Sequence, residues 1–228
     1  MTSLLYQTLV LIHVALGSVA LLSFWTAGLS RKGSRVHRLA GRIYLPAMAA
    51  LLAGAVPMVA IILPRAPVIG GFLAYLLILT ATALWASWRA VRDKRDWVRY
   101  TGPVYRGLAW ACLLAGLAVV WLGLFHARQM QWVIVLFGLI GIVVFVQARR
   151  FVRRPPTDPR WWLKEHLEAM LGNGIATHVA FLGIGLPRLL PMLDPQMLRT
   201  AAWILPIGVA LAAGAWLSRK YLPPRPAR

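Results

Sequence analysis

The sequence predicts an all-α integral membrane protein, a bundle of seven transmembrane helices. Of its 228 residues, 60% are hydrophobic and 14% are charged, whereas a soluble domain carries about 25% charged residues. The charged residues gather in short clusters between long apolar stretches. This composition excludes a soluble enzyme, a disordered chain and a disulfide-stabilised scaffold.

Seven stretches of the chain contain no Lys, Arg, Asp or Glu. About 20 apolar residues, at 1.5 Å per residue, cross a hydrocarbon core of about 30 Å, so each stretch is long enough to span it. They are residues 1–30, 43–64, 66–88, 107–127, 129–148, 169–187 and 200–218. The break between the second and third stretches rests on Pro64 and Pro67, because closely spaced prolines end a helix. The sixth stretch is the most polar, with Asn173, Thr177 and His178.

The stretches form one expected domain, residues 1–221, followed by a disordered cytoplasmic tail, residues 222–228, which contains three prolines. The first stretch lacks a basic region before it and is followed by Arg31 and Lys32, so it is expected to be a retained helix rather than a signal peptide. Cys112 is the only cysteine and lies within the fourth stretch, where a small buried side chain is expected.

The basic residues indicate the orientation in the membrane. Twenty-one of the 25 fall in segments on one side of the expected bundle, and the other side holds Arg65, Arg128, Arg188 and Arg199. The positive-inside rule then places the amino terminus outside and the carboxyl terminus in the cytoplasm of a bacterial cytoplasmic (inner) membrane, which the chain crosses as a multi-pass protein. The basic side chains that give the net charge of +19 are expected to contact anionic lipid. Nucleic acid is not an expected partner.

The most distinctive segment is RKGSRVHRLAGRIY, residues 31–44. It anchors the topology, or it binds lipid headgroups through its basic side chains and its imidazole. The candidate headgroup residues are Arg31, Lys32, Arg35, His37, Arg38 and Arg42.

A polar stripe runs along the sixth stretch and the residues before it. His166, Asn173 and Thr177 recur at helical spacing and share one helix face. Lipid cannot satisfy an amide or an imidazole, so this face is expected to look into the bundle. The stripe either forms hydrogen bonds between helices or lines a polar site for a ligand or protons.

Two histidines are candidate cofactor ligands. Given the expected topology, His13 and His178 each lie nine residues below the outer end of a helix, which is about 13 Å deep. Two imidazoles at one depth suit the axial positions of haem b, so the hypothesis is transmembrane electron transfer with a quinone or another redox partner. Together with His126 they would instead form a three-histidine site for zinc or copper.

Two further functions stay open, and the sequence does not decide whether the protein is an enzyme. A transporter or channel is one, because Pro46, Pro57 and Pro206 could break helices within the membrane. A noncatalytic membrane assembly subunit with structural histidines is the other. The sequence lacks HExxH, GxSxG, Walker and CxxC motifs, which removes the enzyme classes that these motifs mark.

Three segments carry a resemblance to a known group of proteins. They are HVALG at 13–17, RKGSRVHRLAGRIY at 31–44, and WWLKEHLEAMLGNGIATHVAF at 161–181, which contains HLEAMLGNGIATH. Together they resemble a family of uncharacterised prokaryotic multi-pass membrane proteins, a domain of unknown function. The resemblance implies a helical bundle and supplies no activity.

Overall fold

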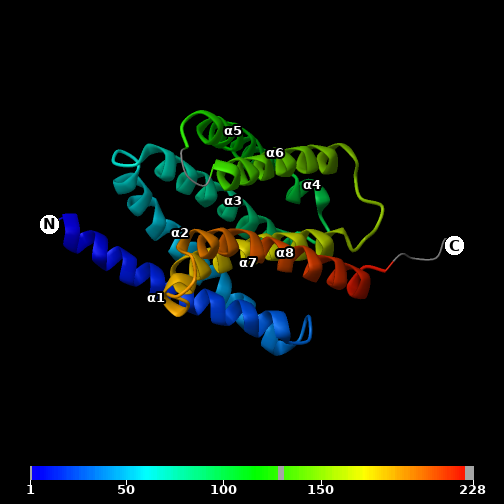
Figure 1. Ribbon diagram of the computed structural model, residues 1–228. Helices are drawn as coiled ribbons and strands as arrows, with labels where there is room; N and C mark the ends of the chain where they lie inside the picture. The colour runs from blue at the N-terminus through cyan, green and yellow to red at the C-terminus, as the bar shows by residue number, and fades with distance from the viewer. Residues whose placement is uncertain (1, 128–130, 224–228) are drawn as a thin grey trace.

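A computed structural model of the chain describes residues 2–127 and 131–223, with the backbone alone for residues 2, 3, 184, 186, 188 and 189. Within these ranges the chain forms seven long helices and one short helix, without a strand (Figure 1). The helices are α1 (Thr2–Leu29), α2 (Arg35–Ile62), α3 (Pro67–Arg92), α4 (Trp97–Tyr100), α5 (Pro103–Phe125), α6 (Gln131–Arg153), α7 (Trp161–Leu189) and α8 (Pro195–Tyr221).

Each of the seven charge-free stretches corresponds to one long helix, so the all-α fold class is confirmed. Six of the described helices are long and apolar enough to cross a membrane, namely α1, α2, α3, α5, α6 and α8. The remaining long helix, α7, is not among them; several side chains near its end lie outside the described residues, and its first turns carry Lys164, Glu165 and Glu168. Arg128 and most of the predicted tail, residues 224–228, lie outside the described residues.

Several helices begin at a polar cap or a proline. Ser34 and Asp194 accept hydrogen bonds from backbone N–H groups in the first turns of α2 and α8. Proline opens α3, α5 and α8, where a missing N–H costs nothing. The predicted break between Ile62 and Pro67 is confirmed. By contrast, α2 and α8 continue through the prolines expected to break them, Pro46, Pro57 and Pro206.

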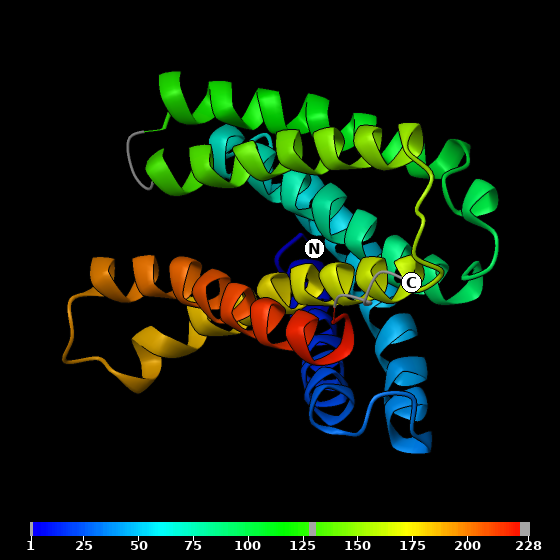
Figure 2. The same ribbon diagram turned by 90° about the vertical axis from the view of Figure 1, so that its right-hand side faces the viewer.

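The helices pack as pairs around α3 (Figure 2). The α5–α6 pair lies on one side, and the α7–α8 pair lies on the other. The α1–α2 pair joins the bundle through contacts of α2 with α3 and a smaller contact of α1 with α7. Helix α7 is therefore enclosed by α3, α8 and α1, which covers the polar helix with protein.

The larger of two apolar clusters ties α3 to the helices around it. Phe72 and Tyr75 of α3 pack with Val119 of α5, Phe137 of α6 and Val179 of α7. The Tyr75 hydroxyl donates to the Phe137 carbonyl oxygen over 2.6 Å, so the polar end of a buried ring is satisfied across the helix contact. This cluster sets the position of the α5–α6 pair relative to α3 and α7.

Glycines set the closest helix contact, between α5 and α6. A Cβ atom on Gly116 would lie 2.7 Å from the Gly138 carbonyl oxygen, and a Cβ on Gly141 would strike the Cys112 carbonyl oxygen. Both obstacles are backbone atoms, which cannot move aside. Small residues of this kind let helix backbones approach each other in lipid, where packing drives association.

We expect Gly138→Ala to destabilise the protein by about 1–3 kcal/mol, because the added methyl group meets the backbone of α5. The matched control is Gly107→Ala, where a Cβ has no neighbour within 4 Å, so the helix should be unchanged or gain up to about 1 kcal/mol. Unfolding of the detergent-solubilised protein measures both. Equal effects of the two changes would contradict the close contact.

Candidate functional site

His178 uses both ring nitrogens in hydrogen bonds. Its Nδ1 lies 2.7 Å from the Gly174 carbonyl oxygen, which can only accept, so Nδ1 carries the proton. Its Nε2 accepts from the Trp25 indole N–H over 3.0 Å, and the Phe24 ring packs edge-on at 5.7 Å. A metal ion at Nε2 would have to displace Trp25.

His13 does not meet His178. Its Nδ1 is buried without a hydrogen-bond partner among the described residues. Phe24 and Trp25 are the α1 residues whose rings contact His178, and they lie eleven and twelve positions beyond His13 in the chain. That separation is about 17 Å along the helix. The arrangement therefore does not favour the haem site predicted for His13 and His178.

The three-histidine site predicted with His126 is not assembled either. His126 ends α5, and its ring packs 4.4 Å from that of Trp121. Across residues 2–127 and 131–223, no three His, Cys, Asp or Glu side chains come close enough to hold a metal ion.

The predicted polar stripe on α7 is enclosed by protein. Asn173 is 0% exposed and Thr177 is 5% exposed. Their side-chain hydrogen bonds stay within α7: Asn173 donates to the Ala169 carbonyl and Thr177 to that of Asn173. Asn173 Oδ1 is buried without a partner in the part of the chain that is described. The Tyr44 hydroxyl of α2 lies near the Thr177 side chain but forms no hydrogen bond of standard geometry with a described residue.

The predicted headgroup segment divides into inward and outward side chains. Lys32 Nζ donates to the carbonyl oxygens of Ala27 and Gly28, and His37 Nδ1 lies 3.0 Å from the Ala27 oxygen. These carbonyls belong to the last turn of α1, where no backbone N–H of the helix reaches them, and the Ser30 hydroxyl also donates to the Ala27 oxygen. Lys32 and His37 therefore cap α1. The exposed residues are Arg31, Arg35, Arg38 and Arg42.

His37 and His166 share one hydrogen-bonding pattern. His166 Nδ1 lies 2.9 Å from the Ser87 carbonyl oxygen of α3, just as His37 Nδ1 meets the Ala27 carbonyl. A carbonyl only accepts, so both Nδ1 atoms carry protons, and in the neutral form of each ring Nε2 holds the free lone pair. Neither Nε2 has a partner among the described residues. Metal-ligating histidines show this same anchoring of the second nitrogen.

The two imidazoles lie at the same end of the bundle, which we call the basic end: the turn 30–34, the segment 93–102, the first turns of α7 and the last turn of α8. Burial lowers the pKa of His166, which precedes the charge-free part of α7, and the nearby charges of His37 and Lys32 lower it further. The hydrogen bond to Ser87 opposes this change in pKa. Burial and Lys220 likewise lower the pKa of Lys32.

The sequence interpretation assigned His37 and His166 to one side of the membrane but did not pair them. The available signal was that each lies in one of the two longest segments that carry the family resemblance. Each also lies in the first two turns of a helix that begins at the basic end. What the sequence did not show is the pair of backbone carbonyls that fix both rings.

A partly buried acid, Glu165, lies next to His166. Tyr100, which is 0% exposed, donates to Glu165 Oε2 over 3.1 Å. Burial raises the pKa of Glu165 to about 7, and the charge of Glu168 adds to the rise. The aromatic rings packed around Tyr100 are those of Trp85, Tyr105, Phe151 and Trp161. Near neutral pH this carboxyl is able to take up or release a proton.

Comparisons with protein-family models, with curated proteins and with solved structures find no match to this chain.

We expect Asn173→Leu to leave stability unchanged or raise it by about 1–2 kcal/mol. Leucine removes an unpaired buried carbonyl oxygen, and the lost hydrogen bond lies within α7. Thr177→Val is the control, since its hydroxyl also donates within the helix, and a change within about 0.5 kcal/mol is expected. Thermal unfolding measures both. A loss of more than about 1 kcal/mol in Asn173→Leu would mean that a bound water or ligand satisfies the amide oxygen.

We expect stability to fall as the pH rises from about 4.5 to about 7. The folded chain holds the Glu165 proton more tightly than the unfolded chain, because its pKa moves from 4.5 to about 7. Glu165→Gln should remove this slope and stabilise the protein by roughly 2–3 kcal/mol above pH 7. Glu168→Gln, which keeps Glu165, should retain a slope. Melting curves across this pH range decide, and an unchanged slope in Glu165→Gln would disprove the assignment.

Proposed function

We propose that the chain is a seven-span protein of the bacterial cytoplasmic membrane, with its amino terminus outside and its carboxyl terminus inside. Support comes from six apolar helices and from the enclosure of α7 by α3 and α8, which hides its polar residues from lipid. The basic residues support the orientation, since they collect at the basic end. The basic end is then cytoplasmic.

We propose that the protein binds haem b at this end, where His37 and His166 would hold the iron. The observation that carries the proposal is the matched pair of Nδ1–carbonyl hydrogen bonds, which leaves Nε2 of each neutral ring available to a metal ion. A lowered pKa keeps the buried His166 neutral, as an iron ligand must be. This assignment replaces His13 and His178 within the same functional hypothesis.

One further feature of the surroundings suits a haem. Lys32 and Lys220 lie close to one another at the same end, and their positive charges suit the two haem propionates. The chemistry that such a haem supplies is one-electron transfer, with a membrane quinone as the first candidate partner.

The optical spectrum of protein expressed with ample haem tests this proposal. We expect a bis-histidine haem spectrum that is lost in His37→Ala and His166→Ala and retained in His13→Ala, His178→Ala and His126→Ala. Retained helical circular dichroism in the first two variants separates loss of a ligand from loss of the fold.

The other outcomes are equally informative. Loss of the spectrum in His13→Ala and His178→Ala alone would restore the pair predicted from the sequence. Dependence on His126, with zinc or copper in metal analysis, would indicate the three-histidine site. A colourless, metal-free preparation would end the haem proposal.

A transporter is the second candidate. The supporting observation is the buried Asn173 Oδ1, which has no hydrogen-bond partner among the described residues. Polar groups within a membrane protein often line the path of a substrate or a proton. The same protein would then be colourless and would lose stability in Asn173→Leu.

A further inference from the structure

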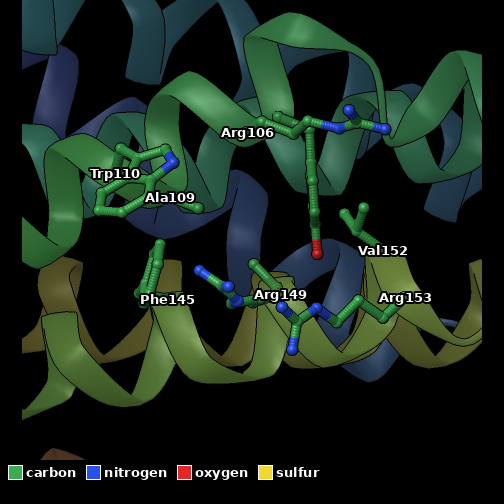
Figure 3. A pocket seen from close by; sticks show the side chains of 9 residues that line it. Arg106, Ala109, Trp110, Phe145, Arg149, Val152 and Arg153 are labelled. Atoms are coloured by element: carbon green, nitrogen blue, oxygen red, sulfur yellow. The ribbon is translucent and has the colours of Figure 1, made fainter.

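A groove lies between α5 and α6 at the basic end, away from the histidine pair (Figure 3). Its volume is about 210 Å³. Arg106 of α5 and Arg149 and Arg153 of α6 line it, together with Trp110 and Phe145. The groove is thus lined by three cationic side chains and two aromatic rings.

The three guanidinium groups have no acidic partners. Among the described residues, Arg106, Arg149 and Arg153 form no ion pair. The acids that do form ion pairs are held by other cations: Asp93 by Arg89 and Arg99, Asp158 by Arg160, and Glu168 by Lys164. The groove therefore keeps a net positive charge of three.

Two of the three cations lie next to each other on α6. Arg149 and Arg153 are four residues apart, so they lie one turn apart on the same face of α6, where like charges repel; Figure 3 shows them side by side. Across the groove, Arg106 Nε donates to the Thr101 carbonyl oxygen over 3.0 Å, which leaves its terminal nitrogens free to bind an anion. A phosphate near these groups would relieve the repulsion and accept paired hydrogen bonds.

The apolar part of the groove continues away from the basic end. The Trp110 and Phe145 rings pack at 4.5 Å, and Trp110 is 49% exposed. They lie about one turn beyond the arginines along their helices. An occupant that matches both parts has an anionic head at the membrane surface and an apolar chain that enters the bilayer.

We propose that this groove is a binding site for an anionic phospholipid, with the phosphate headgroup held by Arg106, Arg149 and Arg153 and an acyl chain against Trp110 and Phe145. The site is distinct from the exposed arginines of residues 31–42, which have no such pair of aromatic rings among their described contacts. Basic pockets between membrane helices on the cytoplasmic side bind anionic lipids in this way.

The test is thermal stability of the full chain in detergent on addition of cardiolipin, phosphatidylglycerol or phosphatidylcholine. We expect the two anionic lipids to raise the melting temperature by several degrees, and the zwitterionic lipid to have little effect. The double variant R149Q/R153Q should lose this shift. The matched control is R150Q/R154Q, which removes the same charge from the last turn of α6 and the residue after it without touching the groove and should retain the shift.

Three outcomes would overturn the proposal. Equal loss in R150Q/R154Q would indicate diffuse attraction to surface charge. An equal shift with inorganic phosphate or glycerophosphate would indicate a soluble anion as the occupant. No shift in the wild-type protein would mean that the groove binds no anionic lipid. Trp110→Ala adds a second check, since it should weaken the response to the lipid and leave any response to glycerophosphate unchanged.

Discussion

A helix that brings an amide and two imidazoles towards a bilayer must be surrounded by protein, because hydrocarbon offers no hydrogen-bond partner. Helix α7 is such a helix, and the packing of the other helices follows from it. Helices α3 and α8 cover its long sides, and α1 closes a third side, where the Phe24 ring lies against Gly174. The α5–α6 pair, which has little polar content within the bilayer, packs mainly against α3.

The sequence predicted the long helices well because their signal is local. A stretch without charge that is long enough to cross a membrane implies a helix wherever it lies in the fold. The ends were less predictable: α2 begins at Arg35 and α7 at Trp161, well before the charge-free stretches 43–64 and 169–187. Basic side chains tolerate a helical backbone at the membrane surface, so charge marks the edge of the bilayer rather than the end of the helix. The four residues of α4 were missed because a single turn has no periodic pattern.

The candidate site was less predictable because its evidence is not local. Depth within one helix was estimated for His13 and His178, but depth says nothing about which neighbour a ring meets. The indole of Trp25 and the carbonyl of Gly174 take both nitrogens of His178. His37 and His166 differ from the other histidines because their Nδ1 atoms bond to backbone carbonyls of other helices, at Ala27 and Ser87. No sequence pattern marks those acceptors. The roles of the histidines therefore depend on hydrogen bonds that only the folded chain defines.

The enclosure of α7 also bears on how the protein enters its membrane. In the seven-span arrangement proposed above, Asn173 within α7 raises the free energy of inserting this helix from the translocon as a separate segment. Synthesis from the amino terminus places α3 in the bilayer before α7 emerges, and α8 follows after only five residues. The polar face of α7 can therefore meet α3 while the chain is still growing. In the proposed topology, the order of the helices along the chain thus provides a protein partner for the polar face of α7 before this helix is made.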